Sequence, residues 1–399
     1  MTTTADYQEL ESKVMFQTGR RAPVTLVRGD GSRVWDTDDT EYLDFVAGIA
    51  VVSLGHAHPV LVDAIKKQAE QLIHISNLYY SVPQVQLAEL LVRVSCLDRV
   101  YFQNSGTEAI EACIKLARKW GHEKKDGAYE IISAESGFHG RTLAAVNASG
   151  TPRYKEPFGP QLPGFINVPF NNVQAIKDAT TPKTCAVLLE PIQGEGGVNI
   201  PDDDYLKQVR AWCDEQHILL ILDEIQTGIG RTGTMFAYEQ FGIEPDIMAL
   251  AKGLAGGVPI GAILAKEEIA AMFVPGDHGS TFSGNPLATA AGYAVLKHIV
   301  DTNLSAQVKE KGERLVAKLH ALEDRHGSIT DVRGRGLLCA VELDSDVAEQ
   351  IAKEALAEGL LLNNLRPNVL RMAPPLTVTD DEIDEAVEKL ERVLVKIGK

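Results

Sequence analysis

Four short apolar segments, separated by polar or helical pattern, constrain most strongly what this chain can fold into. They are "YEIISA" (129–134), "CAVLLE" (185–190), "HILLILDE" (217–224) and "DIMALA" (246–251). Segments this continuously apolar are typical of strands in a mostly parallel sheet that helices cover on both faces. Upstream, "RVYFQ" (99–103) predicts another strand, and an apolar stripe predicts a helix over 106–120. Because ligands of such sheets bind beyond the carboxyl ends of the strands, the residues after each strand are the candidates for function.

The two ends of the chain have a different pattern. Short strand-like pieces occur near the N-terminus, "VTLVRG" and "EYLDFV", and again in the C-terminal third, "GLLCAVEL" and "NVLRMAPP". A last helix is predicted to begin with a capping box, Thr379 with Glu382. We expect an α/β fold with a large domain over 59–290, and a smaller α+β domain built from 1–58 and 291–399.

Charge and composition exclude several classes of partner. The net charge of −16 argues against nucleic acid or an anionic membrane as partner. No apolar run reaches the roughly 18 residues of a membrane span, and the polar first residues do not form a signal core. The five cysteines are scattered without CxxC spacing, so no zinc site is predicted. A cytoplasmic protein without a bound metal is expected.

The segment after the first strand, "NSGTEA" (104–109), has the residues of an anion site. Ser105 and Thr107 are good helix N-cap types, and Gly106 lets the backbone approach a ligand. A helix N-terminus often binds phosphate. The alternative is a plain helix cap, and the segment matches neither the GxxxxGK nor the GxGxxG motif.

Charged or aromatic side chains also follow the later strands. Phe138 and Arg141 come after 129–134, and Glu195 lies among glycines after 185–190. Asp223 closes an apolar strand, so its carboxylate needs a buried partner or a ligand. Lys252 follows "DIMALA" in a similarly apolar setting, where its ammonium must be paired, neutral or directed to water.

Together these residues form the set that pyridoxal phosphate requires. A lysine bonds to the cofactor aldehyde, an acid pairs with the pyridinium nitrogen, an aromatic ring stacks on the cofactor and helix N–H groups hold the phosphate. Each feature alone has a structural explanation, such as an internal salt bridge for Asp223. Their joint occurrence at successive strand ends favours a cofactor site.

The chain resembles the class-III (ω-type) pyridoxal-phosphate aminotransferases of fold type I. The similarity is carried by "LLILDEIQTGIGRTG" (219–233) and "LAKGLAGGVPIGA" (250–262), and it extends from "GIAVVSLGHAHP" (48–59) to "NVLRMAPPLTVT" (368–379). Within the family, "GFHGRT" and "PGDHGSTFSGNPLA" (275–288) are most similar to the members that act on N-acetylornithine.

The resemblance implies roles for the cofactor residues. Lys252 would carry the cofactor and move a proton, and Asp223 would pair with the pyridinium nitrogen. Phe138 and Ile225 would cover the two faces of the ring, and Gln226 would reach its hydroxyl.

The resemblance also implies how the phosphate is held and how the chain assembles. The phosphate would be bound by Ser105, Gly106 and Thr107. Ser280 and Thr281 would reach the site of a neighbouring subunit, with Thr281 on its phosphate. An obligate homodimer with shared active sites is therefore expected.

Together with Ser280, four further residues would recognise substrate. Arg141 would bind the distal carboxylate, and Arg371 the α-carboxylate of glutamate or 2-oxoglutarate, because guanidinium and carboxylate pair in a forked geometry. Glu195 would neutralise Arg371 when an ω-amine is bound. Enzymes for free ornithine have a tyrosine at the position of Ile49. An isoleucine there suits an acylated, uncharged nitrogen.

The implied reaction is transfer of an amino group between N2-acetyl-L-ornithine and 2-oxoglutarate, a step of arginine biosynthesis. Succinylornithine, lysine-pathway, ornithine and 4-aminobutyrate substrates stay open, since one methylene changes binding by only about 1–3 kcal/mol. A non-catalytic cofactor binder would have no use for Glu195. A cofactor-free lyase would have no use for "NSGTEA" or Asp223.

Overall fold

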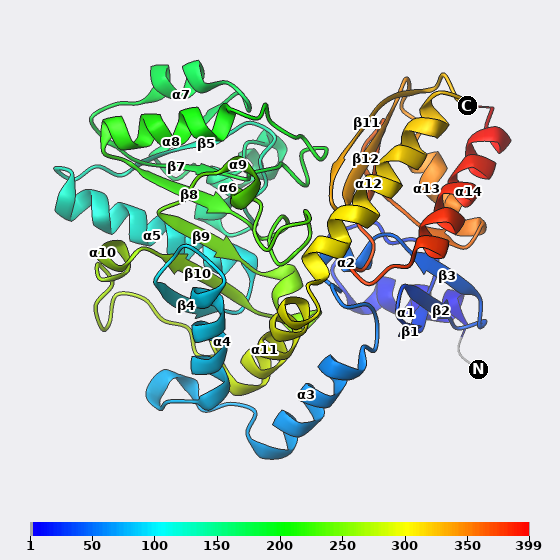
Figure 1. The fold of residues 1–399 in the computed structure, drawn as a ribbon, viewed down its shortest axis with the longest axis horizontal. Helices are drawn as coiled ribbons and strands as arrows, with labels where there is room; N and C mark the ends of the chain where they lie inside the picture. Colours follow the sequence, from blue (N-terminus) through cyan, green and yellow to red (C-terminus); the bar gives the residue numbers. More distant parts are fainter. Residues whose placement is uncertain (1–2, 399) are drawn as a thin grey trace.

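The computed structural model describes residues 3–398, which form a large lobe around a seven-stranded sheet and a smaller lobe beside it (Figure 1). The strand order is β4 (Arg99–Gln103), β10 (Gly261–Ala265), β9 (Ile247–Leu250), β8 (Leu219–Asp223), β7 (Thr184–Leu189), β5 (Glu130–Ala134), β6 (Phe165–Val168). The pairs from β9 to β6 are parallel, and β10 is antiparallel to both of its neighbours. The predicted mostly parallel sheet is confirmed, and β10 is a strand that the sequence patterns did not indicate.

Alternation along the strands produces a separate core on each face of this sheet. On β8, Leu219 and Ile221 pack with the helix α5 (Gly106–Lys124), whereas Leu220 and Leu222 point to the opposite face. That second face is covered by α4 (Val82–Arg93), α8 (Tyr205–Gln216) and α11 (Pro286–Asp301). Both faces are buried, which explains why the central strands β7, β8 and β9 are almost continuously apolar.

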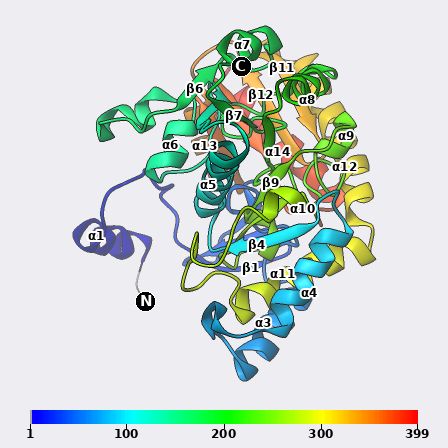
Figure 2. The ribbon, with the colours of Figure 1, turned by 90° about the vertical axis from the view of Figure 1, so that its left-hand side faces the viewer.

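The remaining helices of the large lobe are shorter or lie at its edge. They are α3 (Pro59–Gln71), η1 (Ser76–Leu78), α6 (Leu143–Ala148), η2 (Pro152–Tyr154), η3 (Glu156–Phe158), α7 (Val173–Ala179), α9 (Tyr238–Phe241), η4 (Lys252–Ala255) and α10 (Glu267–Ala270). Helix α1 (Thr4–Val14) buries no residue and stands apart from the rest of the chain (Figure 2). None of the helices within 3–398 has the length and apolar character needed to cross a bilayer.

The smaller lobe joins the two ends of the chain. One sheet has the order β1 (Leu26–Asp30), β2 (Arg33–Asp36), β3 (Glu41–Asp44), β13 (Leu360–Leu361), so a C-terminal strand extends an N-terminal meander. The other has the order β11 (Ile329–Arg335), β12 (Leu338–Leu343), β15 (Val369–Met372), β14 (Asn363–Arg366). They are accompanied by α12 (Leu304–Glu323), α13 (Ala348–Ala357) and α14 (Asp380–Lys396). The capping box predicted at Thr379 and Glu382 is present at the start of α14.

A turn with left-handed backbone, α2 (Ala47–Ala50), links β3 to the large lobe. Its four residues have φ values of 48°, 64°, 68° and 58°, and only one of them is glycine. Left-handed backbone costs roughly 1–2 kcal/mol for each non-glycine residue. Asp44 stabilises the turn, because its Oδ1 accepts hydrogen bonds from the backbone N–H groups of Val46 and Ala47 at 2.9 and 2.8 Å.

Substituting Ile49 with glycine is expected to raise the free energy of unfolding by about 1 kcal/mol. A β-branched residue at a φ of 68° is strained, and Ile49 is 42% exposed, so little burial is lost. Chemical denaturation of the holoprotein measures the change. Val27→Gly is the control, since Val27 is also β-branched and exposed and lies outside the left-handed region. Destabilisation by Ile49→Gly as large as that by Val27→Gly would contradict the claim that the backbone at Ile49 is strained.

Candidate active site

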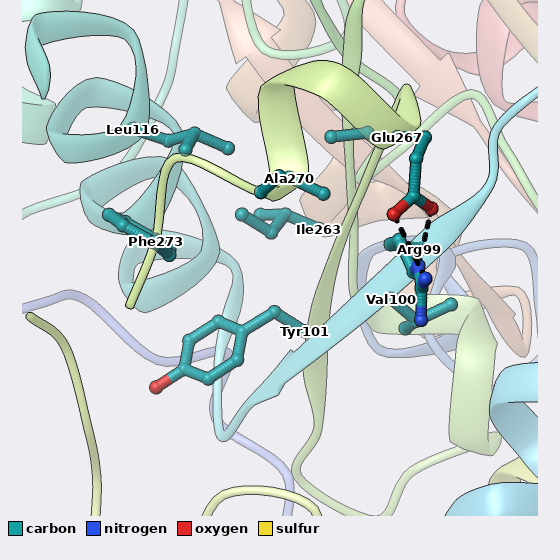
Figure 3. A pocket seen from close by; sticks show the side chains of 10 residues that line it. Arg99, Val100, Tyr101, Leu116, Ile263, Glu267, Ala270 and Phe273 are labelled. Atoms are coloured by element: carbon teal, nitrogen blue, oxygen red, sulfur yellow. Dashed lines mark hydrogen bonds and ion pairs between the residues drawn. The ribbon is translucent and has the colours of Figure 1, made fainter. Parts of the chain in front are cut away.

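A cavity of about 410 Å³ lies at the carboxyl ends of the parallel strands. Ten of the fourteen predicted site residues line it: Ser105, Gly106, Thr107, Phe138, Arg141, Glu195, Asp223, Ile225, Gln226, Lys252. A second cavity of about 310 Å³ is lined mainly by apolar side chains, including Val100, Tyr101 and Phe273 (Figure 3). Its charged residues, Arg99 and Glu267, already pair with each other at 2.5 and 2.9 Å. The two charged groups of this second cavity therefore satisfy each other.

Lys252 projects into the first cavity from the turn after β9. Its own backbone is left-handed, with a φ of 41°, and its side chain is half-buried. Burial lowers the pKa of the Lys252 amine below that of an ordinary lysine, against the opposing charge of Glu195. A lysine with a lowered pKa is more often neutral and hence nucleophilic at physiological pH.

This lowered pKa predicts the pH dependence of cofactor loading. The neutral amine reacts with an aldehyde, so the rate at which Lys252 takes up pyridoxal phosphate should level off at a lower pH than for an ordinary lysine. Stopped-flow mixing of cofactor-free protein with the cofactor, followed by visible absorbance, gives the profile. Nα-acetyl-lysine in solution is the reference amine, and an identical pH midpoint for the two would contradict the prediction.

Asp223 is held by His139, a residue of the loop after 129–134 to which the sequence patterns assigned no role. His139 Nδ1 donates to Asp223 Oδ2 at 2.8 Å, and Asp223 Oδ1 accepts the backbone N–H of Ile225 at 3.0 Å. Burial alone would lower the pKa of His139, but the hydrogen bond and charge of Asp223 raise it. The hydrogen bonds from His139 and Ile225 fix the position of the Asp223 carboxylate, which borders the cavity.

Glu190 is a second site residue that was missed. Its carboxylate accepts the backbone N–H groups of Phe138 at 2.9 Å and Gly194 at 3.0 Å, so it joins the loops after β5 and β7. Burial raises the pKa of Glu190 to about 7. The signal that identified Asp223 was present here too, because Glu190 also ends a wholly apolar strand.

The start of α5 has the predicted cap. Ser105 is the N-cap residue, and its Oγ accepts the backbone N–H of Glu108 at 3.3 Å. A Cβ added to Gly106 would lie 3.0 Å from Cδ1 of Ile225, so this turn packs directly beside the predicted ring site. The first N–H groups of a helix have no partner within the helix and are available to an anion.

Two predicted phosphate-loop residues lie outside the cavity lining. Ser280 Oγ accepts a hydrogen bond from Asn104 Nδ2 at 2.7 Å, which places it at the rim of the cavity of its own chain. Thr281, its neighbour, is exposed. Ile49 is exposed as well, although Val51 from the same segment lines the cavity.

The guanidinium of Arg141 packs on two aromatic rings, Phe138 and Tyr154, which together form an aromatic shelf. Its Cζ is 3.6 Å from the ring centroid of Tyr154 and 5.1 Å from that of Phe138. The two rings meet edge to face, with centroids 6.2 Å apart. Such cation–π contact orients a guanidinium without neutralising it. Tyr154 ends the short helix η2, which has no distinguishing sequence pattern, so this contact could not have been predicted.

Arg371 joins the cavity through Glu195. Its Nη1 donates to Glu195 Oε1 at 2.6 Å and to Gln226 Oε1 at 3.0 Å, and its Nη2 donates to Asn363 Oδ1 at 2.7 Å. Arg371 is 1% exposed, so its charge depends on this partner. Although burial alone would raise the pKa of Glu195, the guanidinium of Arg371 holds it below its usual range.

Glu224, next to Asp223, has a structural role. Its carboxylate accepts the Thr227 hydroxyl and the backbone N–H groups of Ala237 and Tyr238. It therefore caps the start of α9, and burial raises its pKa to about 7. Tyr79 and Tyr80 are 70% and 99% exposed, so they do not pack in the core of this chain.

The residues around the cavity fit pyridoxal phosphate. A half-buried amine at Lys252, a fixed carboxylate at Asp223, an aromatic ring at Phe138 and a capped helix N-terminus at Gly106 border one cavity. Its volume of about 410 Å³ lies within the range of small-molecule sites.

Comparison with known proteins identifies the class. Residues 15–394 match the family described as aminotransferase class-III, and the chain belongs to that family. Acetylornithine aminotransferase of Caldanaerobacter subterraneus subsp. tengcongensis is 52% identical, over 97% of this chain and 98% of that protein.

Solved structures agree in fold. An ornithine aminotransferase from Toxoplasma gondii, described with partial occupancy of PLP at its active site, has a TM-score of 0.96 and 35% identity over 100% of this chain and 96% of that one. Acetylornithine aminotransferase from Elizabethkingia anophelis has a TM-score of 0.89 and 34% identity over 99% and 100%. The chain is a pyridoxal-phosphate-dependent transaminase of the expected fold class.

Proposed function

We propose that this chain interconverts N2-acetyl-L-ornithine plus 2-oxoglutarate and N-acetyl-L-glutamate 5-semialdehyde plus L-glutamate, a reaction of arginine biosynthesis. The pair of Arg371 and Glu195 carries the proposal. An ω-amine has no carboxylate beside its reacting carbon, so the buried Arg371 needs an internal counter-ion while that substrate is bound. Glutamate brings its own carboxylate, which would displace Glu195. A site with this pair can serve both substrates in a ping-pong cycle.

The geometry of the cavity supports the proposed residue roles. Pyridoxal phosphate, when bound, supplies an aldehyde that takes the amino group and a ring that withdraws electrons. Asp223, ion-paired with His139, would hold the ring nitrogen protonated. Lys252 Nζ would move the proton from the substrate carbon that bears the amine to the former aldehyde carbon of the cofactor, and in the second half-reaction it would move a proton in the opposite direction. Ile225 and Phe138 would hold the ring between them, and the Gln226 amide would reach the ring hydroxyl.

The remaining predicted residues would bind the ends of the ligands. Ser105, Gly106 and Thr107 would hold the phosphate at the start of α5. Arg141 on its aromatic shelf would bind the α-carboxylate of acetylornithine or the side-chain carboxylate of glutamate. Ile49 would face the acylated nitrogen.

Steady-state comparison of amine donors tests the substrate. With 2-oxoglutarate as acceptor, kcat/KM should be highest for acetylornithine among acetylornithine, succinylornithine, ornithine and 4-aminobutyrate. A higher value for another donor would keep the transaminase class but assign a sister activity. Arg141 and Arg371 would not distinguish an acetyl from a succinyl group, so acetylornithine and succinylornithine must be compared directly.

Replacing Glu195 with glutamine is expected to weaken the ω-amine half-reaction more than the glutamate half-reaction. The substitution leaves Arg371 without a counter-ion only while an ω-amine is bound, and an uncompensated buried charge is costly. The expected loss in kcat/KM for acetylornithine is on the order of tenfold or more. Single-turnover rates with each substrate measure it, and Glu268→Gln on the exposed face of α10 is the control. Equal losses in both halves would reject the switch.

We also propose a homodimer in which Thr281 reaches the phosphate of the partner's site and Ser280 lies beside it. Exposed apolar side chains gather near this loop: Leu72, Ile73, Leu78, Tyr79, Tyr80, Val82, Val85, Phe282. Asn77 ties that segment to the loop through Ser283 O at 3.0 Å. So large an apolar surface is typical of an interface. Light scattering of the holoprotein should give twice the chain mass of 43.3 kDa, and a monomer would contradict the proposal.

The proposed domain division is 1–58 with 291–399, and 59–290 for the cofactor-binding domain. The pairing of β13 with β3 supports it, because the strand from the C-terminal part completes the N-terminal sheet. We propose a cytoplasmic location, since all five cysteines are free thiols, as is usual in reducing compartments.

A further inference from the structure

The loop that carries Glu195 is a small hairpin held at its base. Gln193 and Asn199 pair as an antiparallel bridge, with backbone hydrogen bonds of 3.0 Å in both directions. Asn199 Nδ2 adds hydrogen bonds to Gln193 Oε1 at 2.9 Å and to Gly196 O at 3.2 Å. Glu195 lies near the tip of this hairpin, so the position of the hairpin determines where its carboxylate lies.

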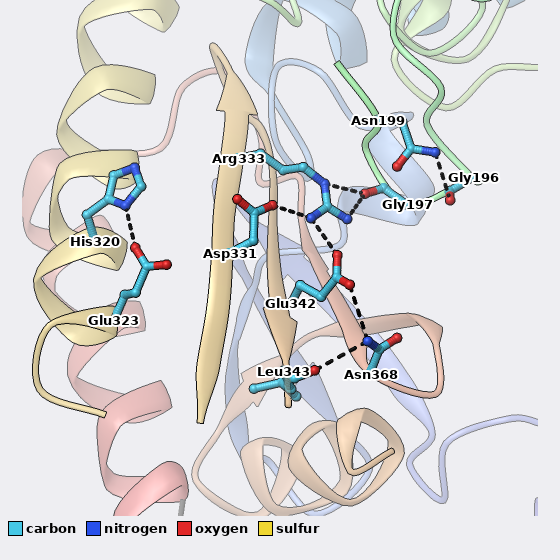
Figure 4. Close-up of polar contacts among 10 residues, drawn as sticks. All are labelled: Gly196, Gly197, Asn199, His320, Glu323, Asp331, Arg333, Glu342, Leu343 and Asn368. Atoms are coloured by element: carbon cyan, nitrogen blue, oxygen red, sulfur yellow. Dashed lines mark hydrogen bonds and ion pairs between the residues drawn. The ribbon is translucent and has the colours of Figure 1, made fainter. Parts of the chain in front are cut away.

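Arg333 on β11 of the small lobe donates hydrogen bonds to the hairpin. Arg333 Nε and Nη2 both donate to the carbonyl oxygen of Gly197, at 3.1 and 2.8 Å (Figure 4). Its Nη1 pairs with Glu342 Oε2 at 2.7 Å and with Asp331. Two carboxylates therefore fix the guanidinium of Arg333, and its Nε and Nη2 donors both point at the carbonyl oxygen of Gly197.

Arg333 and Arg371 belong to the same sheet, in which β11, β12 and β15 are consecutive. Arg333 holds the backbone of the hairpin, and Arg371 holds the Glu195 carboxylate at 2.6 Å. The two contacts differ in kind. A substrate carboxylate can replace Glu195 on Arg371, whereas the contact with Gly197 O involves no substrate group. During the exchange the backbone would stay in place while the side chain moves.

We propose that Arg333 is a positioning residue for substrate alternation, which keeps the Glu195 hairpin seated so that the carboxylate returns to Arg371 whenever an ω-amine binds. This inference rests on the proposed function. Weakening the contact between Arg333 and Gly197 O should lower kcat/KM of the ω-amine half-reaction, which needs Glu195 paired with Arg371. It should spare the glutamate half-reaction, which needs Glu195 to leave.

The test compares Arg333→Met and Arg333→Lys in the holoprotein. For Arg333→Met, kcat/KM in single turnovers should fall about tenfold with acetylornithine, the scale of one charge-assisted hydrogen bond, and change less than about twofold with glutamate. Arg333→Lys keeps a positive charge beside Asp331 and Glu342 but loses the two N–H groups that donate to Gly197 O. If the chain folds normally, this variant should also lose more kcat/KM with acetylornithine than with glutamate. Equal losses in both half-reactions would overturn the inference.

Two further comparisons separate positioning from general damage. Arg335 lies two residues along β11 and pairs with Asp203 at 2.9 Å, away from the hairpin, so Arg335→Met should leave the ratio of the two half-reactions unchanged. In a Glu195→Gln background, Arg333→Met should have no further selective effect. If Glu195→Gln itself is not selective, the proposed function fails. If it is selective and Arg333→Met is not, only this inference fails.

Hydrogen exchange gives a readout independent of turnover. Peptides covering 193–199 in the Arg333→Met holoprotein should exchange several-fold faster than in the parent, because the hairpin loses its contact with Arg333 of the small lobe. The corresponding peptides of Arg335→Met should be unchanged. Unchanged exchange in Arg333→Met would overturn the inference, because the hairpin would then be held by its other hydrogen bonds, such as that from Gly194 N–H to Glu190.

Discussion

Replacement of Lys252 with alanine is expected to lower kcat by at least roughly 10³-fold while the protein still binds pyridoxal phosphate noncovalently. Lys252 is the amine that borders the cavity beside Asp223 and Phe138, and proton transfer by a positioned side chain alone contributes about 10²–10⁴-fold. The phosphate site at the start of α5 is untouched by the substitution. Turnover assays and equilibrium dialysis of the cofactor measure the two quantities separately.

The control is Lys67→Ala on the exposed face of α3, which should leave both activity and cofactor binding unchanged. Added methylamine should restore part of the activity of Lys252→Ala, because a small amine can take over proton transfer in the space left by the side chain. Parent-like turnover by Lys252→Ala would remove this lysine from the mechanism.

Replacement of Asp223 with asparagine is expected to lower kcat by on the order of 10–100-fold, the equivalent of losing a hydrogen bond of about 1.5–3 kcal/mol to a charged group. The amide cannot hold the ring nitrogen protonated, so electron withdrawal from the substrate carbon weakens. His139 should also lose its raised pKa, because Asp223 is what raises it. Presteady-state kinetics and NMR titration of the histidines measure these effects.

Asp246→Asn is the matched control for the loss of a buried aspartate. Asp246 is 7% exposed, immediately precedes β9 and pairs with Arg210 at 2.8 Å. Its replacement should lower stability and leave kcat within about twofold. If both variants lower kcat equally, then Asp223 acts through the fold rather than on the cofactor.

Much of the site could be predicted because the residues lie at the ends of buried parallel strands. Asp223 and Lys252 follow continuous apolar runs, and the topology brings the carboxyl ends of those runs to one edge. The same reasoning applied to Glu190 would have found it. The fold class followed from the same strands, although periodicity gives no strand direction and β10 was missed.

The remaining contacts join residues that are distant in the chain and have no local pattern. Arg333 and Gly197 are 136 residues apart, and His139 and Asp223 are 84 apart. Tyr154 contacts Arg141 from the short helix η2, which no sequence pattern indicated. The left-handed turn around Ile49 contradicts local propensity, since only tertiary contacts such as those of Asp44 can hold it. These features required the folded structure.

Single-turnover spectroscopy of the holoprotein tests the central claim most directly. The protein is mixed separately with acetylornithine, glutamate, ornithine and 4-aminobutyrate, and the loss of the visible absorbance of the bound cofactor is followed. The account predicts fast loss with acetylornithine and with glutamate, and slow loss with the other two. Fast loss with ornithine or 4-aminobutyrate and slow loss with acetylornithine would contradict the proposed substrate.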